Sequence, residues 1–162
     1  MWYYKDSVRQ SVLRYKFYRK RSYAQVYGKM IALKLVQEEM DHFDILTWVP
    51  VSRRRKFTRG FDQVELLAKQ VALQLGISAV PTLKKIRHTP PQSGLGNAAH
   101  RRANVLGAFR MRDTDAVKDK RILLLDDIIT TGATASECAR ILMTAGAEKV
   151  ELAVLAVANH EK

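Results

Sequence analysis

The chain has 162 residues, a length that suits one domain with one sizeable core, and 28 lysines and arginines against 16 aspartates and glutamates give it a formal net charge of +12. No apolar run approaches the roughly 18 residues of a membrane-spanning helix, and the first residues lack the apolar core of a secretory signal, so we expect no membrane span. The single cysteine excludes an intrachain disulfide and predicts a cytoplasmic location, while the positive charge favours anionic partners: nucleic acid, anionic lipid or small phosphorylated ligands.

The first third of the chain predicts two helices and a strand. Helical patterns cover residues 7–17 and 22–40, joined by a basic run. Residues 45–49 predict a buried strand with Trp48 in the core, because the run is apolar and Pro50 stops it. In the second helix, six side chains fall on one side at helical spacing and are expected to pack inward: Tyr23, Val26, Tyr27, Met30, Ile31 and Leu35.

The middle of the chain predicts a capped helix followed by a long loop. Residues 62–75 read as a helix in which Asp62 caps the N-terminus, Glu65 follows three residues later, and Gly76 ends the element. Residues 84–102 contain two prolines and two glycines. A connection of this length in a compact domain is usually functional or disordered, so we predict a flexible loop there.

The last third of the chain predicts three strands and a helix: strands at 104–111, 121–125 and 150–158, and a helix at 133–145 that Gly146 ends. Strands that alternate with helices indicate a mostly parallel sheet flanked by helices, which is an α/β fold. We expect one domain over residues 1–162, with the N-terminal helices of residues 1–40 packing on it.

The segment richest in functional signal follows the predicted strand at 121–125. Two carboxylates, Asp126 and Asp127, precede a Thr/Gly loop that opens a helix. Backbone amides and threonine hydroxyls at a helix N-terminus favour a phosphate, and Gly132 permits the tight turn. Carboxylates beside a phosphate suit sugar hydroxyls, gripped directly or through a divalent cation. The plainer alternative is a strand that ends in a helix cap.

Two other phosphate-binding classes are disfavoured. The loop is not followed by Gly-Lys-Ser or Gly-Lys-Thr, and the chain has no Gly-x-Gly-x-x-Gly fingerprint. The pattern therefore argues against an NTPase or a dinucleotide enzyme. It favours a site for a phosphorylated ribose.

This segment resembles the phosphoribosyl pyrophosphate (PRPP) motif of type I phosphoribosyltransferases. The resemblance implies a type I phosphoribosyltransferase-like fold, Mg²⁺ that arrives with PRPP, and no metal site built by the protein alone. In that family the acidic pair holds the ribose hydroxyls and the loop holds the 5′-phosphate. By position, the PRPP-binding residues are Asp126, Asp127, Thr130, Thr131, Gly132, Ala133 and Thr134.

Further segments resemble the ComF-type proteins associated with bacterial competence: residues 12–17, residues 49–52, residues 59–63, Gln92 and residues 101–105. Many ComF-type relatives carry a Cys-rich, zinc-binding segment before this domain, and a single cysteine rules out a four-cysteine site here. The resemblance implies a part in DNA uptake during natural transformation. The partners that it implies are single-stranded DNA and a competence helicase or another DNA-uptake protein.

The family pattern also suggests residues for three further roles, each with a structural alternative. Candidates for a pyrophosphate loop, or else a solvated basic loop, are Ser52, Arg53, Arg54 and Arg59. Candidates for a flexible catalytic loop that excludes water, or else a mobile surface loop, are Arg87, Gln92, Arg101 and Arg102. Candidates for nucleic-acid contacts, next to aromatics that also suit helix packing, are Lys16, Arg19, Lys20 and Arg21.

Three functions fit these patterns. The leading one is a phosphoribosyltransferase, a glycosyltransferase in which an acceptor attacks C1′ of PRPP and displaces pyrophosphate; the sequence does not specify the acceptor. The second is a non-enzymatic module that recruits DNA or another protein of the uptake machinery. The third is a nucleobase salvage phosphoribosyltransferase. Cys138 is interpreted as a packed small residue rather than as a nucleophile.

Overall fold

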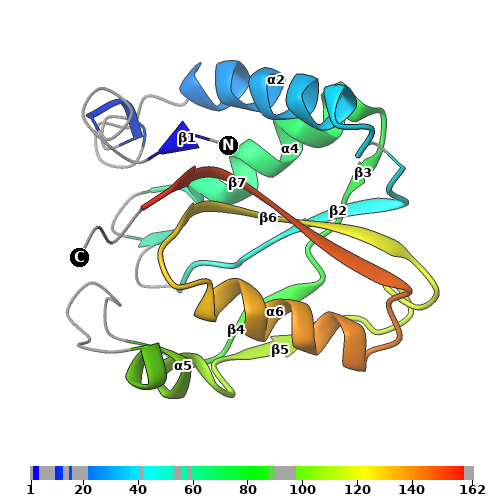
Figure 1. Ribbon diagram of the computed structural model, residues 1–162. Coiled ribbons are helices and arrows are strands. Elements are labelled where there is room, and N and C mark those ends of the chain that lie inside the picture. The colour runs from blue at the N-terminus through cyan, green and yellow to red at the C-terminus, as the bar shows by residue number, and fades with distance from the viewer. Residues whose placement is uncertain are drawn as a thin grey trace.

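The computed structural model describes residues 2–3, 10–12, 15, 22–40, 42–52, 56–57, 60–87, 89 and 98–158. Its main sheet has five strands in the order β1-β7-β6-β2-β3, and every pairing between neighbours is parallel (Figure 1). The strands are β1 (Trp2–Tyr3), β2 (Ile45–Trp48), β3 (Ser78–Ala79), β6 (Arg121–Ile129) and β7 (Lys149–Val157). The predicted α/β fold is confirmed.

Helices cover both faces of this sheet. Helices α2 (Ser22–Gln37) and α4 (Gln63–Leu75) lie on one face, and α6 (Ala133–Thr144) lies on the other (Figure 1). The strands separate two hydrophobic cores, because successive side chains of a strand point to opposite faces. On β6, Leu123 and Leu125 join the core under α2 and α4, whereas Ile122 and Leu124 join the core under α6.

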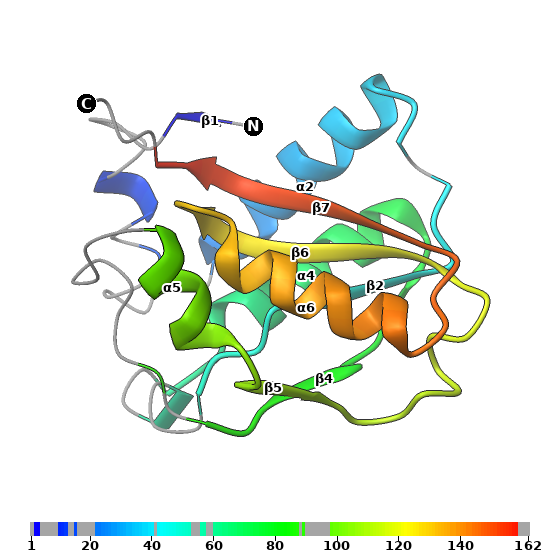
Figure 2. The same cartoon turned by 60° about the horizontal axis from the view of Figure 1, so that its bottom comes forward.

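A small second sheet lies beside α6. It pairs β4 (Leu83–Lys85) antiparallel with β5 (Phe109–Met111), and α5 (Ala98–Val105) lies next to it (Figure 2). The predicted strand at 104–111 is therefore wrong at its start, since residues 104–105 end a helix. Good helix formers at residues 98–103 favour the helix, and Gly107, with φ of +68°, turns the chain into β5.

The other predicted elements need smaller corrections. Strand β6 runs four residues beyond its predicted end at Leu125, paired with β7 as far as Ile129. The predicted loop at 84–102 begins inside β4 and ends inside α5. Of the predicted helix at 7–17, residues 10–12 and 15 are helical, and the others lie outside the described residues. Within the described ranges, no helix has both the length and the apolar character needed to cross a membrane.

Helix α4 begins and ends as predicted. The Asp62 carboxylate accepts hydrogen bonds from the backbone amides of Val64 (3.0 Å) and Glu65 (3.1 Å), and Gly76 ends the helix in the left-handed region with φ of 68°. The cap fixes the position of the first turn of α4 next to the carboxyl ends of β2 and β6.

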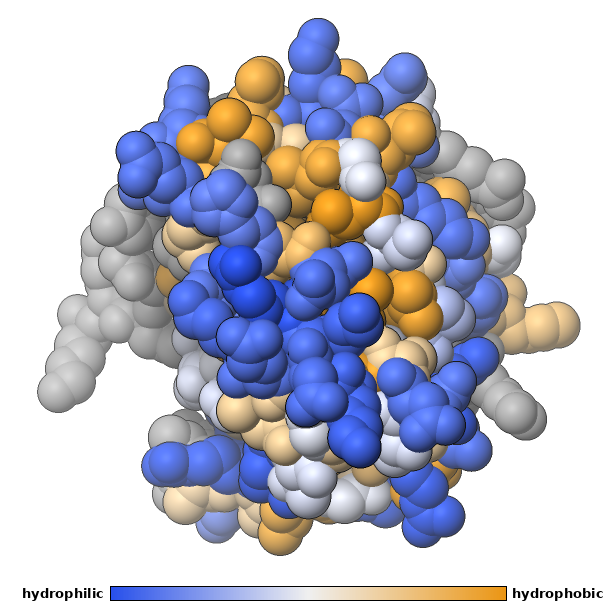
Figure 3. Space-filling model, turned by 90° about the vertical axis from the view of Figure 1, so that its right-hand side faces the viewer, coloured by the Kyte–Doolittle hydropathy of each residue, from blue (hydrophilic) through white to orange (hydrophobic). Residues whose placement is uncertain are grey.

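The predicted inward face of α2 is wrong at two positions. Val26 and Met30 are 57% and 40% exposed, whereas Gly28 is buried against α4. The two helices approach closely at Gly28, and the buried face of α2 therefore includes the small residues Ala24, Gly28 and Ala32 beside Ile31 and Leu35. The apolar side chains left exposed on α2 and α4 are Val26, Met30, Leu33, Val36 and Leu73. Figure 3 shows hydrophobic surface gathered over the ends of these helices, above a hydrophilic band.

Candidate functional site

The acidic pair lies at the carboxyl end of β6, on the central part of the sheet. Strand alternation directs the two side chains to opposite faces. Asp127 continues the face of Leu123 and Leu125, is buried, and accepts a hydrogen bond from the Gln63 side-chain amide of α4 (Nε2 to Oδ2, 3.2 Å). Asp126 lies on the other face of the sheet, which α6 covers, and is only partly buried. Its charge adds to the effect of burial in raising the pKa of Cys138 on α6.

Backbone amides hold both carboxylates in place. The Asp127 amide donates to Asp126 Oδ1 (2.8 Å), and the Ile128 amide donates to Asp127 Oδ1 (2.6 Å). Hydrogen bonds from backbone amides stabilise the charged form of a carboxylate and limit its rotation. Each carboxylate is thus oriented at the carboxyl-terminal edge of the sheet, formed by the ends of the parallel strands, where open α/β folds bind ligands.

The threonine loop links this edge to α6. Thr130 and Thr131 are exposed, and Gly132 takes the N-cap position of α6 with φ of 75°. The first helical hydrogen bond runs from the Ser136 amide to the Gly132 carbonyl (2.8 Å). Gly132 has no side chain to accept from the first amides of the helix, so this N-terminus is suited to an anion.

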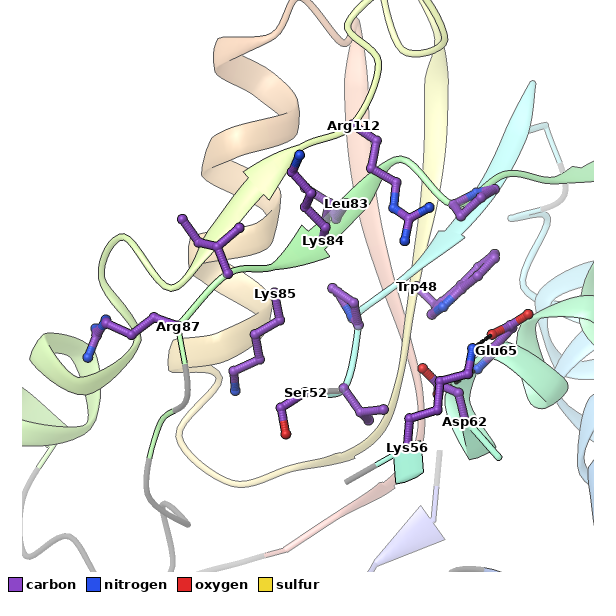
Figure 4. Close-up of a pocket in the computed structure, with 14 residues that line it drawn as sticks. Trp48, Ser52, Lys56, Asp62, Glu65, Leu83, Lys84, Lys85, Arg87 and Arg112 are labelled. Carbon is purple, nitrogen blue, oxygen red and sulfur yellow. Dashed lines mark hydrogen bonds and ion pairs between the residues drawn. The ribbon is translucent and has the colours of Figure 1, made fainter. Parts of the chain in front are cut away.

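A pocket of about 860 Å³ opens beside this edge, between the end of β2, the start of α4 and the small sheet of β4 and β5 (Figure 4). Trp48 of β2 pairs with Leu125 of β6, so the pocket and the acidic pair meet the same edge of the sheet. Residues 126–134 are not among the pocket walls, which are Trp48, Pro50, Val51, Ser52, Lys56, Asp62, Glu65, Pro81, Leu83, Lys84, Lys85, Ile86, Arg87 and Arg112.

The charges around the pocket favour an anionic ligand. Five basic residues line it, against Asp62 and Glu65. The Asp62 carboxylate is occupied in capping α4, and Glu65 pairs with Lys56 (3.0 Å) and with a lysine of its own helix. Sequence reasoning missed Lys84, Lys85 and Arg112 as pocket residues. The pairing of β4 with β5 brings Arg112 beside β4, and nothing local in the sequence indicates that pairing.

The structure describes only some of the residues predicted for the pyrophosphate loop, the flexible loop and nucleic-acid contacts. Ser52 is buried and lines the pocket, whereas Arg53, Arg54, Arg59, Gln92 and the nucleic-acid candidates Lys16, Arg19, Lys20 and Arg21 lie outside the described residues. Arg101 and Arg102 lie on α5, not in a loop. Their predicted contacts with a ligand stay predictions.

Arg87 has a structural role that the sequence did not indicate. Its guanidinium donates to the carbonyls of Asn104 (2.9 Å) and Leu106 (3.0 Å) at the end of α5, and Figure 4 shows the side chain pointing away from Ser52. A cation there stabilises the unsatisfied carbonyls at the helix C-terminus. In this arrangement, Arg87 holds α5 against the end of β4.

Glu137 anchors α6 to the turn after α5. Its carboxylate accepts from the Gly107 amide (Oε1, 3.1 Å) and from two nitrogens of Arg140 (2.9 and 3.0 Å). The hydrogen bonds from Arg140 lower the pKa of Glu137 most, and the Gly107 amide adds to the effect against the opposing effect of burial. The helix that carries the threonine loop is thereby tied to the β5 side of the molecule.

We predict that Glu137→Gln lowers the free energy of unfolding by about 1 kcal/mol at pH 7. Because the folded-state pKa of Glu137 lies below its ordinary value of 4.5, the carboxylate contributes stability above that value and loses it as the pH falls through the folded-state pKa. Urea unfolding of both proteins between pH 7 and pH 3 measures the difference, which should shrink in acid. The exposed Glu148→Gln is the matched control, and an equal effect of both variants would contradict the prediction.

Comparisons with known proteins identify the family of the chain. The phosphoribosyl transferase domain family matches residues 65–162. Competence protein F of Haemophilus influenzae is 34% identical over 106 residues, which cover 64% of this chain and 46% of the relative. The competence protein ComFC of Streptococcus pneumoniae is 29% identical over 148 residues, 91% of this chain and 62% of the relative. DNA utilization protein YhgH of Salmonella typhimurium is 34% identical over 110 residues, 67% of this chain and 47% of the relative.

Solved structures show the same fold. The glutamine PRPP amidotransferase of B. subtilis aligns with a TM-score of 0.60 at 24% identity, covering 88% of this chain and 30% of that one. The adenine phosphoribosyltransferase of Thermoanaerobacter pseudethanolicus aligns with a TM-score of 0.54 at 20% identity, covering 82% and 66%. The chain spans about half the length of competence protein F and of YhgH. It belongs to the phosphoribosyl transferase domain family, among relatives that are ComF-type competence and DNA utilization proteins.

Proposed function

We propose that this chain binds PRPP together with Mg²⁺ and acts in the use of DNA taken up during competence. The observation that carries the proposal is the meeting of three features at the carboxyl-terminal edge of the sheet: the oriented acidic pair, the threonine loop at the N-terminus of α6 with Gly132 as its N-cap, and the basic pocket. These features match the three parts of PRPP, which are the ribose hydroxyls, the 5′-phosphate and the diphosphate.

The residues present fit a magnesium ion that comes with its ligand. Among the described residues, no group of three or more His, Cys, Asp or Glu side chains could hold a metal ion. Mg²⁺ keeps several waters and commonly binds through substrate phosphates and one or two carboxylates. In our proposal the ion would arrive with PRPP, and Asp126, the less buried of the pair, would be the residue that holds it. The ion would neutralise charge on the diphosphate.

As a transferase, the chain would hold C1′ of the ribose in reach of an acceptor. A new bond from the acceptor to C1′ forms while the bond from C1′ to the diphosphate oxygen breaks, and the diphosphate leaves with the bonding electrons. The acidic pair orients the ribose, the amides of the threonine loop fix its 5′-phosphate, and Lys84, Lys85 and Arg112 stabilise the departing charge. The acceptor itself forms no part of the proposal.

A second candidate function is a binding module without catalysis. The names of the relatives favour it, because they refer to competence and DNA utilization rather than to a reaction. In that case, PRPP would act as a ligand that regulates recruitment of DNA or of a partner protein. The two functions share the ribose-phosphate site and differ in whether diphosphate is released.

Calorimetric titration with PRPP, with and without Mg²⁺, tests the proposal. We expect saturable binding of one PRPP per chain that weakens when Mg²⁺ is chelated, and weaker binding of ribose 5-phosphate, which lacks the diphosphate. Diphosphate release in the presence of nucleobases or small amines would then separate transferase from binding module. No binding at millimolar PRPP by a protein that circular dichroism shows to be folded would contradict the proposal.

A further inference from the structure

Gln63 is a buried polar residue that connects α4 to the acidic pair. It is the first residue of α4, directly after the Asp62 cap, and it is 2% exposed. A glutamine is rarely buried to this degree unless its amide is satisfied by a specific partner. Here the amide nitrogen donates to the Asp127 carboxylate across 64 residues of sequence.

The contact completes the restraint on Asp127. Oδ1 accepts from the Ile128 amide at 2.6 Å, and Oδ2 accepts from Gln63 Nε2 at 3.2 Å, so each carboxylate oxygen has a donor on a different element. One hydrogen bond would let the carboxylate rotate about that contact. Two bonds from β6 and α4 fix the plane of the carboxylate at the sheet edge.

Gln63 is itself held from the other side. The hydroxyl of the fully buried Tyr15 donates to the Gln63 backbone carbonyl. The Tyr15 ring packs against Tyr27 of α2 and against Phe61, with centroids 5.8 and 6.4 Å away. Burial first, and then the charge of Asp127, raises the pKa of Tyr15, so its hydroxyl stays protonated and remains a donor.

The other end of the Gln63 amide points to a functional reason for this arrangement. Among the residues that the structure describes, Gln63 Oε1 is a buried side-chain oxygen with no hydrogen-bond partner. Such an atom costs stability that an apolar side chain of the same shape would not. A methionine or leucine at this position would avoid that cost but would leave Asp127 Oδ2 without the donor of α4, so the glutamine is explained by the carboxylate that it holds.

We infer that Gln63 is a positioning residue, whose side-chain amide sets the orientation in which Asp127 meets the ribose hydroxyls. The inference rests on the proposed function, because that proposal supplies the ligand. The hydrogen bond between Gln63 and Asp127 does not depend on the ligand. Gln63 acts only through Asp127, so its contribution to affinity should disappear when Asp127 no longer presents a carboxylate.

A double-mutant cycle measures this dependence. PRPP affinity in the presence of Mg²⁺ and the free energy of unfolding in urea are determined for the parent, Gln63→Met, Asp127→Asn and the double variant. The matched control is Gln74→Met, the same substitution at an exposed position of the same helix. Should Gln63→Met not fold, Gln63→Glu takes its place in both backgrounds, because a glutamate on α4 repels Asp127 and can accept from an asparagine amide on β6.

We expect Gln63→Met to weaken PRPP binding about tenfold to hundredfold in the parent, the loss typical of one hydrogen bond to a charged group, and less than about threefold in the Asp127→Asn background. The exchanged pair, Gln63→Glu with Asp127→Asn, should restore stability without restoring affinity. An equal loss in both backgrounds, or a loss no larger than that of Gln74→Met, overturns the inference. If the parent binds no PRPP, the proposed function fails. In that case the unfolding cycle still tests the contact: a measurable coupling energy between Gln63 and Asp127 would support it, and zero coupling would overturn the inference as well.

Discussion

Replacing both members of the acidic pair, as Asp126→Asn with Asp127→Asn, should weaken PRPP binding by at least about a hundredfold. Each substitution keeps the shape of the side chain and removes the negative charge that makes a hydrogen bond to a ribose hydroxyl strong, and such bonds contribute about 1.5–3 kcal/mol each. Calorimetry with Mg²⁺ present measures the loss. The fold should survive, because the amides of residues 127 and 128 can still donate to the side-chain oxygens of asparagine.

The control for this experiment removes the same charge elsewhere. Asp115→Asn with Asp119→Asn changes two exposed carboxylates in the segment between β5 and β6, and Asn tolerates the left-handed backbone of Asp119. This variant should bind PRPP as the parent does. Equal losses in both double variants would mean that net charge alone governs binding, and unchanged affinity in the acidic-pair variant would place the ribose elsewhere.

Gly28→Ala should lower the free energy of unfolding by about 1–3 kcal/mol, although alanine favours a helix more than glycine does. A Cβ at position 28 would lie 2.5 Å from the Cβ of Gln70 and 3.1 Å from its carbonyl carbon. Both neighbours belong to the rigid part of α4, so relief requires the two helices to move apart. The midpoint of urea unfolding, followed by circular dichroism, measures the effect.

A second substitution checks that this steric contact is the cause. Gln70→Gly removes the opposing Cβ, so it should recover part of the loss when combined with Gly28→Ala, despite the cost of a glycine within a helix. Gln25→Ala, on the exposed side of α2, should leave stability within about 0.5 kcal/mol of the parent. Additive losses in the combined variant would rule out the contact between α2 and α4 as the source of the effect.

Local signals in the sequence were sufficient for the elements that carry the site. The apolar run before Asp126, the Asp62 cap and Gly76 all have short-range causes, and the structure confirms each of them. Strands β1 and β3 escaped prediction because two residues cannot show a period. The inward face of α2 was misjudged because its position depends on how closely α4 approaches at Gly28, a tertiary property with no local signature.

The candidate site was predictable in composition and less so in geometry. Two adjacent aspartates indicate a sugar site. The predicted strand ended at Leu125, so it did not specify the directions of the two side chains. The observed β6 continues to Ile129, and its alternation directs the two carboxylates to opposite faces of the sheet. The partnership between Gln63 and Asp127, and the gathering of Lys84 and Arg112, arise from packing between segments far apart in the chain. Periodicity and spacing report only on neighbours within a few residues.

The placement of the two aspartates has a mechanical consequence. One carboxylate belongs to the layer of α2 and α4, and the other belongs to the layer of α6, and each layer has its own apolar core. A ribose bound by both carboxylates would link the two layers at the carboxyl-terminal end of the sheet. Local opening of either layer would then require release of the sugar, so two regions that could loosen independently would open as one cooperative unit.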